Sequence, residues 1–519
     1  MTQEPLAQPT IRALRPATLT LDHVWLAAAL ILIALRPLLS PIPPHDFWWH
    51  LATGRAIVAQ GRIPTTDSFS YTQFGQPFYN QGWLAELLMY GIYQLGGVPL
   101  ILLVQSLVMA LAYGLLLRLC VIRTGRLRLC VVLLLLATLP LSFSNWVVRP
   151  QSYTFPIFVG FLTILTEYRL GRSNRLWLLP LLMALWVNMH GAFVLGLALI
   201  GLTFIGEFLK RFKPNRRPTT DDRRPTTDDG PISQFSILNS QFILWSALTA
   251  LAVLLNPRGT GVLSYVRNLL GSSSVTTLVE EWAPPTIRDA GSNGLIFFLF
   301  VIGCAAVLIY ARRRPELTDM LLFGAFFWLA LGATRNIVWF GFVATPLLVT
   351  QAATLLPAPG PARRPAGSPV LNAVLIGLLA LLLVLGLPWV KPSLDLPPEV
   401  GALLTEDTPV AAVERLRTEP ERPRHLFHSE GYGSYLIWAA PEQPVFIDTR
   451  IELYPYQQWA DYINLGQGNN VAELLQKYAI DGLLLNKQRQ ERLVAVMRAD
   501  PAWMLRYEDA QTIYLLRRQ

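Results

Sequence analysis

Long apolar runs separated by short polar connections follow one another from about residue 24 to residue 390. Several runs approach the roughly 20 residues that a helix needs to cross the hydrocarbon core of a membrane. The shorter runs fit helices that are sheltered by their neighbours. The pattern predicts a mostly α-helical polytopic membrane protein with about eleven transmembrane helices, at Val24–Ile42, Val98–Leu119, Leu129–Val148, Ser152–Leu170, Leu176–Met189, Gly191–Leu209, Ile237–Leu255, Gly294–Ala311, Met320–Ala333, Ile337–Leu356 and Val370–Val390.

One further apolar stretch, Trp83–Leu95 (WLAELLMYGIYQL), is brief and carries Glu86. An amphipathic segment of this kind can lie on the membrane surface and bury one face. We therefore predict a long first external loop, residues 43–97, that contains a surface helix. This segment is called the first loop below.

Composition and charge narrow the class of protein. The chain is 52% apolar and only 15% charged, whereas soluble globular proteins carry about 25% charged residues, so an ordinary soluble enzyme is excluded. The net charge of +9 reflects basic residues in short connections, at 118–128, 169–175, 210–224 and 312–314. Because positively charged loops face the cytoplasm, these clusters predict a cytoplasmic N-terminus rather than nucleic-acid binding. The three cysteines show no CxxC spacing and indicate neither a disulfide framework nor a metal site.

Two changes in composition divide the chain. Residues 210–236 include the tandem repeat RRPTTDDRRPTTDD, which has no apolar content and predicts a disordered cytoplasmic linker. From residue 393 to residue 519 the sequence becomes mixed polar and apolar. RHLFH, PVFIDTR, DGLLLN, WMLRYE and TIYLLRR are typical of strands, and NNVAELLQKYA and ERLVAVMRA of helices. We expect a membrane domain over 1–392 and a small extracytoplasmic α/β domain over 393–519.

Polar motifs recur at the span ends that this topology places outside the cytoplasm. Ionisable groups at membrane depth are costly unless they serve a cavity, so their convergence on one face predicts a functional site. The motifs are HDFWWH with Asp46, Trp48, Trp49 and His50, VRPQ with Arg149, VNMHG with Asn188 and His190, NPRG with Asn256 and Arg258, EEW with Glu280 and Glu281, and TRN with Arg335 and Asn336.

Several of these residues have a structural explanation beside the functional one. Asp46 can be a helix cap or a solvated loop acid, and its neighbouring tryptophans an interfacial aromatic belt. Asp46 and His50 are four residues apart, so on a helix they share a face and could ligate a metal or hold each other's charge. Arg149 and Arg335 can anchor helix ends or grip phosphate oxygens. His190 can be satisfied within a tight turn, and NPRG is first a turn signal.

The quoted motifs, with HDFWWHLATGRAIVAQGRIPTTDSFSYT, GWLAELLMYGIYQLGG and GYGSYLIW...PVFIDTRIELY, resemble a group of bacterial polytopic membrane proteins placed among the GT-C-type glycosyltransferases. The resemblance covers residue 44 to about residue 486. It implies a sugar donor on a polyprenyl phosphate and a location in the bacterial cell membrane. It also implies that Asp46 is the base that deprotonates an acceptor, which can be a glycan, lipid or protein outside the cytoplasm.

The residues of this sequence match the implied sugar-transfer reaction in part. Inverting displacement at an anomeric carbon needs one positioned base, and cations or donors for the departing phosphate; Arg149, Arg258, Arg335 and His190 are candidates. The sequence departs from the family where Gln81-Gly82 precedes Trp83, because related sequences often carry His-Glu there. A second acid, if one is needed, would be Glu86 or Asp67. No phosphate loop for a sugar nucleotide is present, and a divalent metal remains an option.

Two rival functions stay open at this point. A flippase or transporter of lipid-linked intermediates would use the polar face as a path, although no internal repeat typical of transporters is visible. A non-catalytic envelope-glycan assembly protein would use the C-terminal domain to bind a partner. In that domain Asp448, Arg450 and Glu452 alternate in IDTRIELY, and they could bind acceptor or form a salt-bridged strand end.

Overall fold

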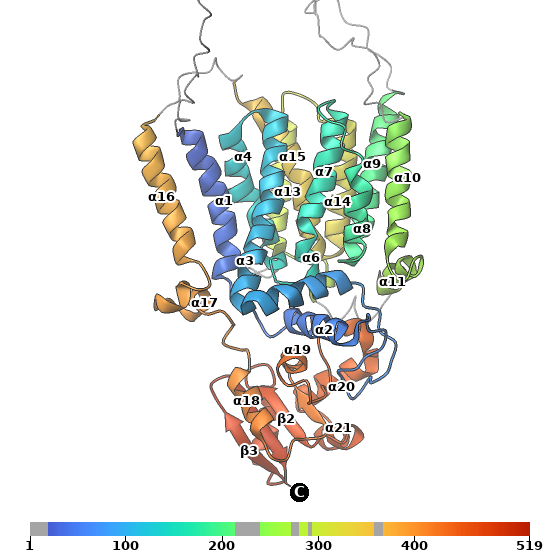
Figure 1. The fold of residues 1–519 in the computed structure, drawn as a ribbon, viewed down its shortest axis with the longest axis vertical. Helices are drawn as coiled ribbons and strands as arrows, with labels where there is room; N and C mark the ends of the chain where they lie inside the picture. Colours follow the sequence, from blue (N-terminus) through green and yellow to red (C-terminus); the bar gives the residue numbers. More distant parts are fainter. Residues whose placement is uncertain (1–18, 213–238, 271–279, 289–292, 358–366, 519) are drawn as a thin grey trace, which may run out of the picture.

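The computed structural model describes residues 19–212, 239–270, 280–288, 293–357 and 367–518. It consists of a bundle of upright helices, a layer of helices that lie across one end of the bundle, and a small α/β domain beyond that layer (Figure 1). From residue 213 on, the predicted disordered linker lies outside the described residues.

A helix lies on every apolar segment that the sequence predicts to be a span. The upright helices are α1 (Leu21–Leu39), the second part of α3 (Trp83–Thr124), α4 (Leu127–Leu133) with its continuation to Asn145, α7 (Phe155–Arg169), α8 (Leu178–Trp186), α9 (Val194–Lys210), α10 (Ser240–Ala252), α13 (Asn293–Tyr310), α14 (Leu317–Gly332), α15 (Ile337–Leu355) and α16 (Pro369–Leu385). Five helical segments of the described chain are long and apolar enough to cross a membrane, and four shorter ones are also apolar. The protein is therefore a multi-pass membrane protein, while the number of eleven crossings stays a prediction.

A glycine pair divides α3 into two parts. Gly97 has φ +60° and Gly96 also departs from helical geometry, so the helix bends between Leu95 and Val98. Glycine adopts such a positive φ without steric cost. Figure 1 shows the first part of α3 lying across the lower end of the bundle, beside α2 (Asp46–Gln60). The helix that the sequence predicts over Trp83–Leu95 is thus present and separate from the upright part.

The packing of α2 on α3 depends on a small residue. A Cβ atom at Gly54 would lie 2.3 Å from the carbonyl oxygen of Glu86, so any larger side chain would push the two helices apart. This close approach places α2, which carries Asp46 and His50, directly against the helix that carries Glu86.

The C-terminal domain contains a four-stranded sheet in the order β1-β2-β4-β3. Strand β1 (Leu426–His428) pairs in parallel with β2 (Gly482–Asn486), while β4 (Thr512–Arg517) runs antiparallel to both β2 and β3 (Trp503–Glu508). The helices of the domain are α18 (Val410–Thr418), α19 (Glu430–Ala439), α20 (Tyr456–Gly466), α21 (Val471–Lys477) and α22 (Glu491–Ala499). Four of the five predicted strands and both predicted helices are therefore confirmed.

The fifth predicted strand, PVFIDTR, is wrong. Within it only Val445 makes a bridge, and its partner is Ser70 of the first loop rather than a strand of the sheet. The Val445 amide donates to the carbonyl of Phe69 at 3.0 Å, and the Tyr71 amide donates to the carbonyl of Val445 at 3.1 Å. The alternation of apolar and polar residues is real, but it serves the contact between the two parts of the molecule.

The opposite end of the bundle is held by ion pairs. Arg169, whose side chain is 5% exposed, contacts Glu207 at 2.9 Å, Asp319 at 3.1 Å and Glu316 at 2.6 Å. A buried guanidinium is tolerated when carboxylates surround it. This cluster joins the ends of α7, α9 and α14 far from the C-terminal domain (Figure 1).

Candidate active site

The candidate site begins with Asp46, which lies at the junction between the bundle and the C-terminal domain. Asp46 is the first residue of α2, and His45 precedes it as the N-cap. A carboxylate in the first helical turn is favoured by the helix dipole. Asp46 is therefore not the helix cap that the sequence allowed, and its side chain is 31% exposed.

A row of alternating charges extends from Asp46. Nη1 of Arg149 lies 3.9 Å from Oδ2 of Asp46 and 2.9 Å from Oε2 of Glu281. Nη1 of Arg335 lies 3.4 Å from Oε1 of Glu281. The four residues come from α2, the start of α6 (Pro150–Tyr153), η5 (Glu280–Trp282) and η6 (Thr334–Asn336). Segments far apart in the sequence thus meet at one point, as their predicted positions at the external ends of the spans imply.

Short backbone links fix the last two segments of this row. The Thr334 amide donates to the carbonyl of Ala283, and the Thr334 hydroxyl donates to the carbonyl of Glu281, both at 3.0 Å. The guanidinium of Arg335 also lies over the ring of Trp282 at 4.6 Å. Glu281, which the sequence marks only as part of EEW, is therefore held between two arginines. The side chain of Glu280 lies outside the described part of the site.

Arg149 is incompletely paired. Its side chain is only 11% exposed, and its Nε and Nη2 atoms are buried without a hydrogen-bond partner among the described residues. Buried polar groups are nearly always hydrogen-bonded, and an unpaired one costs free energy. Two donors of one guanidinium are therefore available for a ligand with acidic oxygens, in the planar geometry that suits phosphate.

The charge state of Glu281 follows from the same arrangement. Burial alone would raise the pKa of its carboxyl, but Arg149 and Arg335 outweigh that effect and lower the pKa below its ordinary value. Glu281 is therefore ionised at neutral pH. It compensates one of the two arginine charges and leaves net positive charge beside Asp46.

His190 supplies a neutral donor at this site. Its Nδ1 accepts a hydrogen bond from the Ala192 amide at 3.1 Å, in a tight turn before α9. Burial, together with Arg335 and Arg149, lowers the pKa of the imidazole well below its ordinary value. With Nδ1 accepting, the proton of the neutral ring lies on Nε2, which can donate. The expected turn is therefore present and uses Nδ1, while a role of Nε2 in binding a substrate stays a prediction.

His50 is held by Glu86. The Nδ1 atom of His50 lies 2.8 Å from Oε1 of Glu86, whose side chain is fully buried. Its ring also lies against the Trp49 ring at 3.6 Å. A carboxylate behind a histidine fixes the orientation and tautomer of the ring. The structure therefore places Glu86 behind His50 rather than beside Asp46.

Asp67 lies in a different cluster. Its carboxylate pairs with Nη1 of Arg450 at 2.7 Å, and Arg450 also pairs with Asp448 at 2.6 Å. All three side chains are at most 1% exposed. Although burial opposes the change, Arg450 lowers the pKa of Asp448. This cluster, the Asp67–Arg450–Asp448 triad, ties the first loop to the C-terminal domain and accounts for most of IDTRIELY as structure.

Asn188 and Arg258 do not join the row of charges. The Asn188 side chain accepts from the Trp83 indole at 2.9 Å and donates to the Ala184 carbonyl at 2.8 Å, so it fastens the start of α3 to α8. Arg258 is exposed and lies 4.2 Å from the centre of the Tyr79 ring.

The two tryptophans of HDFWWH are buried rather than displayed. Trp48 is 2% exposed, donates from its indole to the Pro43 carbonyl at 3.1 Å and packs edge-on against Tyr435. Trp49 is 8% exposed and contacts Phe78. Both rings hold α2 in place, and the structure gives them no open face for a sugar or lipid.

Two further residues lie near the site: Glu452, for which the sequence allowed acceptor binding or a salt-bridged strand end, and Tyr265, which the sequence did not single out. Glu452 is exposed, and its carboxylate interacts electrostatically with Arg450, Asp448 and Asp46. Tyr265 of α11 (Gly261–Leu270) stacks on Tyr79 at 4.4 Å and interacts electrostatically with Glu452 and Arg335. A single tyrosine in an amphipathic helix carries no motif, so nothing in the sequence pointed to it.

The described residues around Asp46 do not fit a divalent metal. Within the described chain no group of three or more His, Cys, Asp or Glu side chains is placed to hold a metal ion. The nearest charged groups to Asp46 and Glu281 are guanidinium groups rather than further carboxylates. We therefore assign no step to a metal.

Solved structures share this architecture. The archaeal oligosaccharyltransferase AglB from Archaeoglobus fulgidus, solved with an inhibitory peptide and a dolichol-phosphate, matches with a TM-score of 0.52 and 12% identity over 95% of this chain and 74% of its own. The apo form of the same organism's oligosaccharyltransferase matches with a TM-score of 0.52, 13% identity and coverage of 96% and 74%. ArnT from Cupriavidus metallidurans, bound to undecaprenyl phosphate, follows with a TM-score of 0.49, 12% identity and coverage of 95% and 97%.

No protein-family model and no curated protein matches the chain. At identities of 12% and 13%, the oligosaccharyltransferase structures speak for the fold alone. These neighbours are GT-C-type glycosyltransferases, so the GT-C-like fold that the sequence predicts is confirmed.

Proposed function

We propose that the protein is a membrane glycosyltransferase that moves a sugar from a polyprenyl-phosphate donor to an acceptor outside the cytoplasm. The observation that carries the proposal is Arg149, a nearly buried guanidinium whose Nε and Nη2 have no partner among the described residues. Its Nη1 lies 3.9 Å from the partly exposed carboxylate of Asp46. The likeness in fold to oligosaccharyltransferases supports it.

In the proposed reaction, an acceptor oxygen attacks the anomeric carbon and displaces the lipid phosphate with inversion. Asp46 accepts the proton that the acceptor loses, and such a base typically contributes 10²–10⁴-fold to the rate. Negative charge grows on the phosphate oxygen as the bond to the sugar breaks. Donors placed where that charge develops lower the barrier, and Arg149, Arg335 and the Nε2–H of His190 are the available ones.

Glu281 and Glu86 act through other residues. Glu281 contacts Arg149 and Arg335 at 2.9 Å and 3.4 Å and so fixes the two guanidinium groups that would grip the phosphate. Glu86 orients His50, which lies close enough to His190 to lower its pKa. In this proposal Asp46 takes part directly in the chemistry, and the two glutamates have a supporting role.

The proposal is tested by the lipids that co-purify with the protein in nanodiscs. Mass spectrometry would compare wild type with Asp46→Asn, which keeps the size of the side chain and removes the base. We expect a polyprenyl-phosphate sugar to be enriched in Asp46→Asn, because the donor binds but is not consumed. Bulk phospholipid alone in both proteins would overturn the proposal and favour the transport or assembly alternatives.

A further inference from the structure

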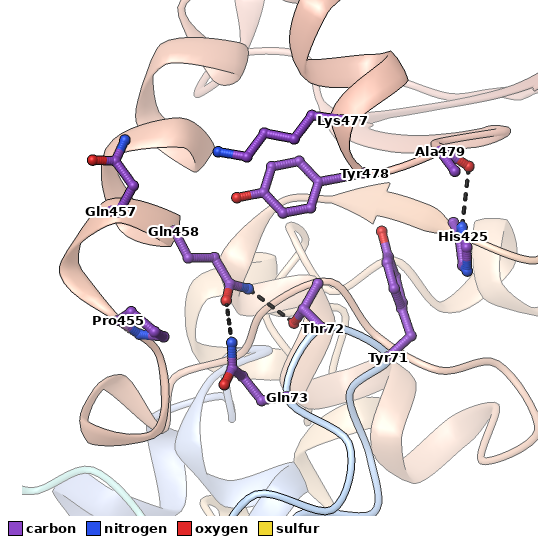
Figure 2. A pocket seen from close by; sticks show the side chains of 10 residues that line it. All are labelled: Tyr71, Thr72, Gln73, His425, Pro455, Gln457, Gln458, Lys477, Tyr478 and Ala479. Carbon is purple, nitrogen blue, oxygen red and sulfur yellow. Dashed lines mark hydrogen bonds between the residues drawn. The ribbon is translucent and has the colours of Figure 1, made fainter.

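A second site lies where the first loop meets the C-terminal domain. A cavity of about 460 Å³ opens there, lined on one side by Tyr71, Thr72 and Gln73 and on the other by residues of α20, α21 and the segment before β1 (Figure 2). This volume falls in the range of about 300–1,000 Å³ that small-ligand sites occupy. Nothing in the proposed transfer reaction uses these residues.

Primary amides dominate the polar lining of the cavity. Gln73 donates from Nε2 to Oε1 of Gln458 at 2.8 Å, and Gln458 donates from Nε2 to the Thr72 hydroxyl at 2.9 Å (Figure 2). Gln457 adds an exposed amide at the start of α20. Gln458 is thus satisfied within the protein, and Gln457 donates from Nε2 to Asp461 at 2.9 Å. The carbonyl oxygens of Gln73 and Gln457 are the amide acceptors that the lining offers to a ligand donor.

The cavity is electrically neutral. Among its lining residues, all of them described, there is no Asp or Glu. The ammonium of Lys477 is paired with the carboxylate of Asp461, and the ring of His425 faces the Ala479 carbonyl at 3.1 Å from Nδ1. An ionic ligand would therefore find no unpaired opposite charge here.

Aromatic rings form the other part of the lining. The rings of Tyr71 and His425 stack at 4.6 Å with an angle of 17° between their planes, and Tyr478 lies across from them (Figure 2). The hydroxyl of Tyr71 is buried and has no hydrogen-bond partner among the described residues. Since buried hydroxyls normally find a partner, this group is a candidate partner for a polar ligand atom in the cavity.

We propose that this cavity binds a neutral oligosaccharide. Sugar hydroxyls both donate and accept, which amides can satisfy, and the apolar faces of sugar rings pack on aromatic rings. A peptide would bring backbone groups but would also need pockets for its side chains, whereas this lining offers amides and aromatic rings. That the oligosaccharide is the acceptor of the transfer rests on the proposed function; that the cavity binds it does not.

The test is a glycan array probed with the labelled full-length protein in nanodiscs. The array carries neutral and acidic oligosaccharides together with unglycosylated peptides. We expect wild type and Asp46→Asn to bind a neutral oligosaccharide equally, because Asp46 lies outside the cavity.

Tyr71→Phe should weaken binding about five-fold, the value of one neutral hydrogen bond, without lowering thermal stability. Gln457→Ala should also weaken binding, whereas the exposed residue Gln476 of α21, which does not line the cavity, provides a matched control as Gln476→Ala.

The outcomes separate this inference from the proposed function. Loss of binding in Tyr71→Phe and Gln457→Ala but not in Gln476→Ala supports a saccharide site. Binding that is unchanged in all variants, or retention of peptides instead of glycans, overturns it. Absence of glycan binding together with donor enrichment in Asp46→Asn would overturn the cavity as a saccharide site and leave the proposed function intact.

Discussion

Two clusters of the same residue types lie at the junction of the bundle and the C-terminal domain, and they differ in how fully the arginine is paired. In the Asp67–Arg450–Asp448 triad, Nη1, Nη2 and Nε of Arg450 each face a carboxylate oxygen. In the row from Asp46 to Arg335, Arg149 directs one nitrogen to carboxylates and leaves two others unpartnered. In the first cluster the protein itself supplies a partner for every guanidinium nitrogen, whereas in the second a ligand would have to supply two of them.

A structural charge cluster and a functional one differ here in how many guanidinium nitrogens have a hydrogen-bond partner. Burial does not separate them, because Arg149 is 11% exposed and Arg450 is 1% exposed. The count of satisfied nitrogens does separate them, since an evolved fold rarely leaves buried donors unpaired without a use.

Asp46→Asn, which removes the proposed base, should abolish most of the transfer activity but leave the stability of the protein nearly unchanged. We expect Asp46→Asn to lower the transfer rate by roughly 10²–10⁴-fold, because the acceptor proton loses its destination. The melting temperature should stay near that of wild type, since Asp46 is 31% exposed and its contact with Arg149 is long. Asp22→Asn, at an exposed acid at the other end of the bundle, is the control and should keep full activity.

Breaking the complete cluster should instead destabilise the protein. Arg450→Met leaves Asp67 and Asp448 buried without a cation, and removing one partner of a buried pair costs about 3–5 kcal/mol. Arg417→Met removes an exposed pair with Glu414, which is worth about 0–1 kcal/mol. Thermal unfolding in nanodiscs measures both, and equal melting temperatures for the two variants would show that the triad does not hold the junction.

Changing the shape but not the charge of Arg149 should weaken the site. Arg149→Lys keeps one positive charge and removes the planar set of donors, so we expect kcat/KM to fall by about 10²-fold, in the range for loss of a donor to developing charge. Arg258→Lys should change kcat/KM by only a few-fold, because Arg258 lies exposed on the Tyr79 ring. If Arg149→Lys lowered kcat/KM no more than Arg258→Lys does, Arg149 would act only through its charge.

The smallest effect concerns acid stability. The pKa of Glu281 is lowered in the folded protein, so its ionised form stabilises the fold above the unfolded-state pKa of about 4.3. This contribution is lost as the pH falls through the lowered folded-state value. We expect wild type to lose more stability than Glu281→Gln between pH 5 and pH 3, measured by thermal unfolding. Parallel curves for the two proteins would show that Glu281 is not held by its arginines.

Sequence patterns predicted the helices well because apolar length and helix formation are local properties. The separate helix over Trp83–Leu95 was predicted from its brief apolar run with Glu86, whereas the bend at Gly96-Gly97 that separates it from the next helix was not predicted. The strand predicted at PVFIDTR failed because alternation cannot tell which partner a segment pairs with, and here Val445 pairs with the first loop.

The site was predicted in part for the same reason. Topology brought Asp46, Arg149 and Arg335 to one end of the bundle, and they lie together in the structure. Asp67 and Asp46 are both loop acids in the sequence, however, and only their partners, Arg450 and Arg149, distinguish them. Which arginine pairs with which aspartate, across hundreds of residues, depends on the folded chain and cannot be predicted from the sequence around either residue.

The central claim is that the open guanidinium of Arg149 binds a lipid phosphate, and native mass spectrometry tests it most directly. Undecaprenyl phosphate would be titrated into wild type, Arg149→Gln and Arg258→Gln in nanodiscs, and the bound fraction measured. We predict one bound lipid phosphate in wild type and in Arg258→Gln, and at least a ten-fold loss of affinity in Arg149→Gln. Equal binding by all three proteins would contradict the claim.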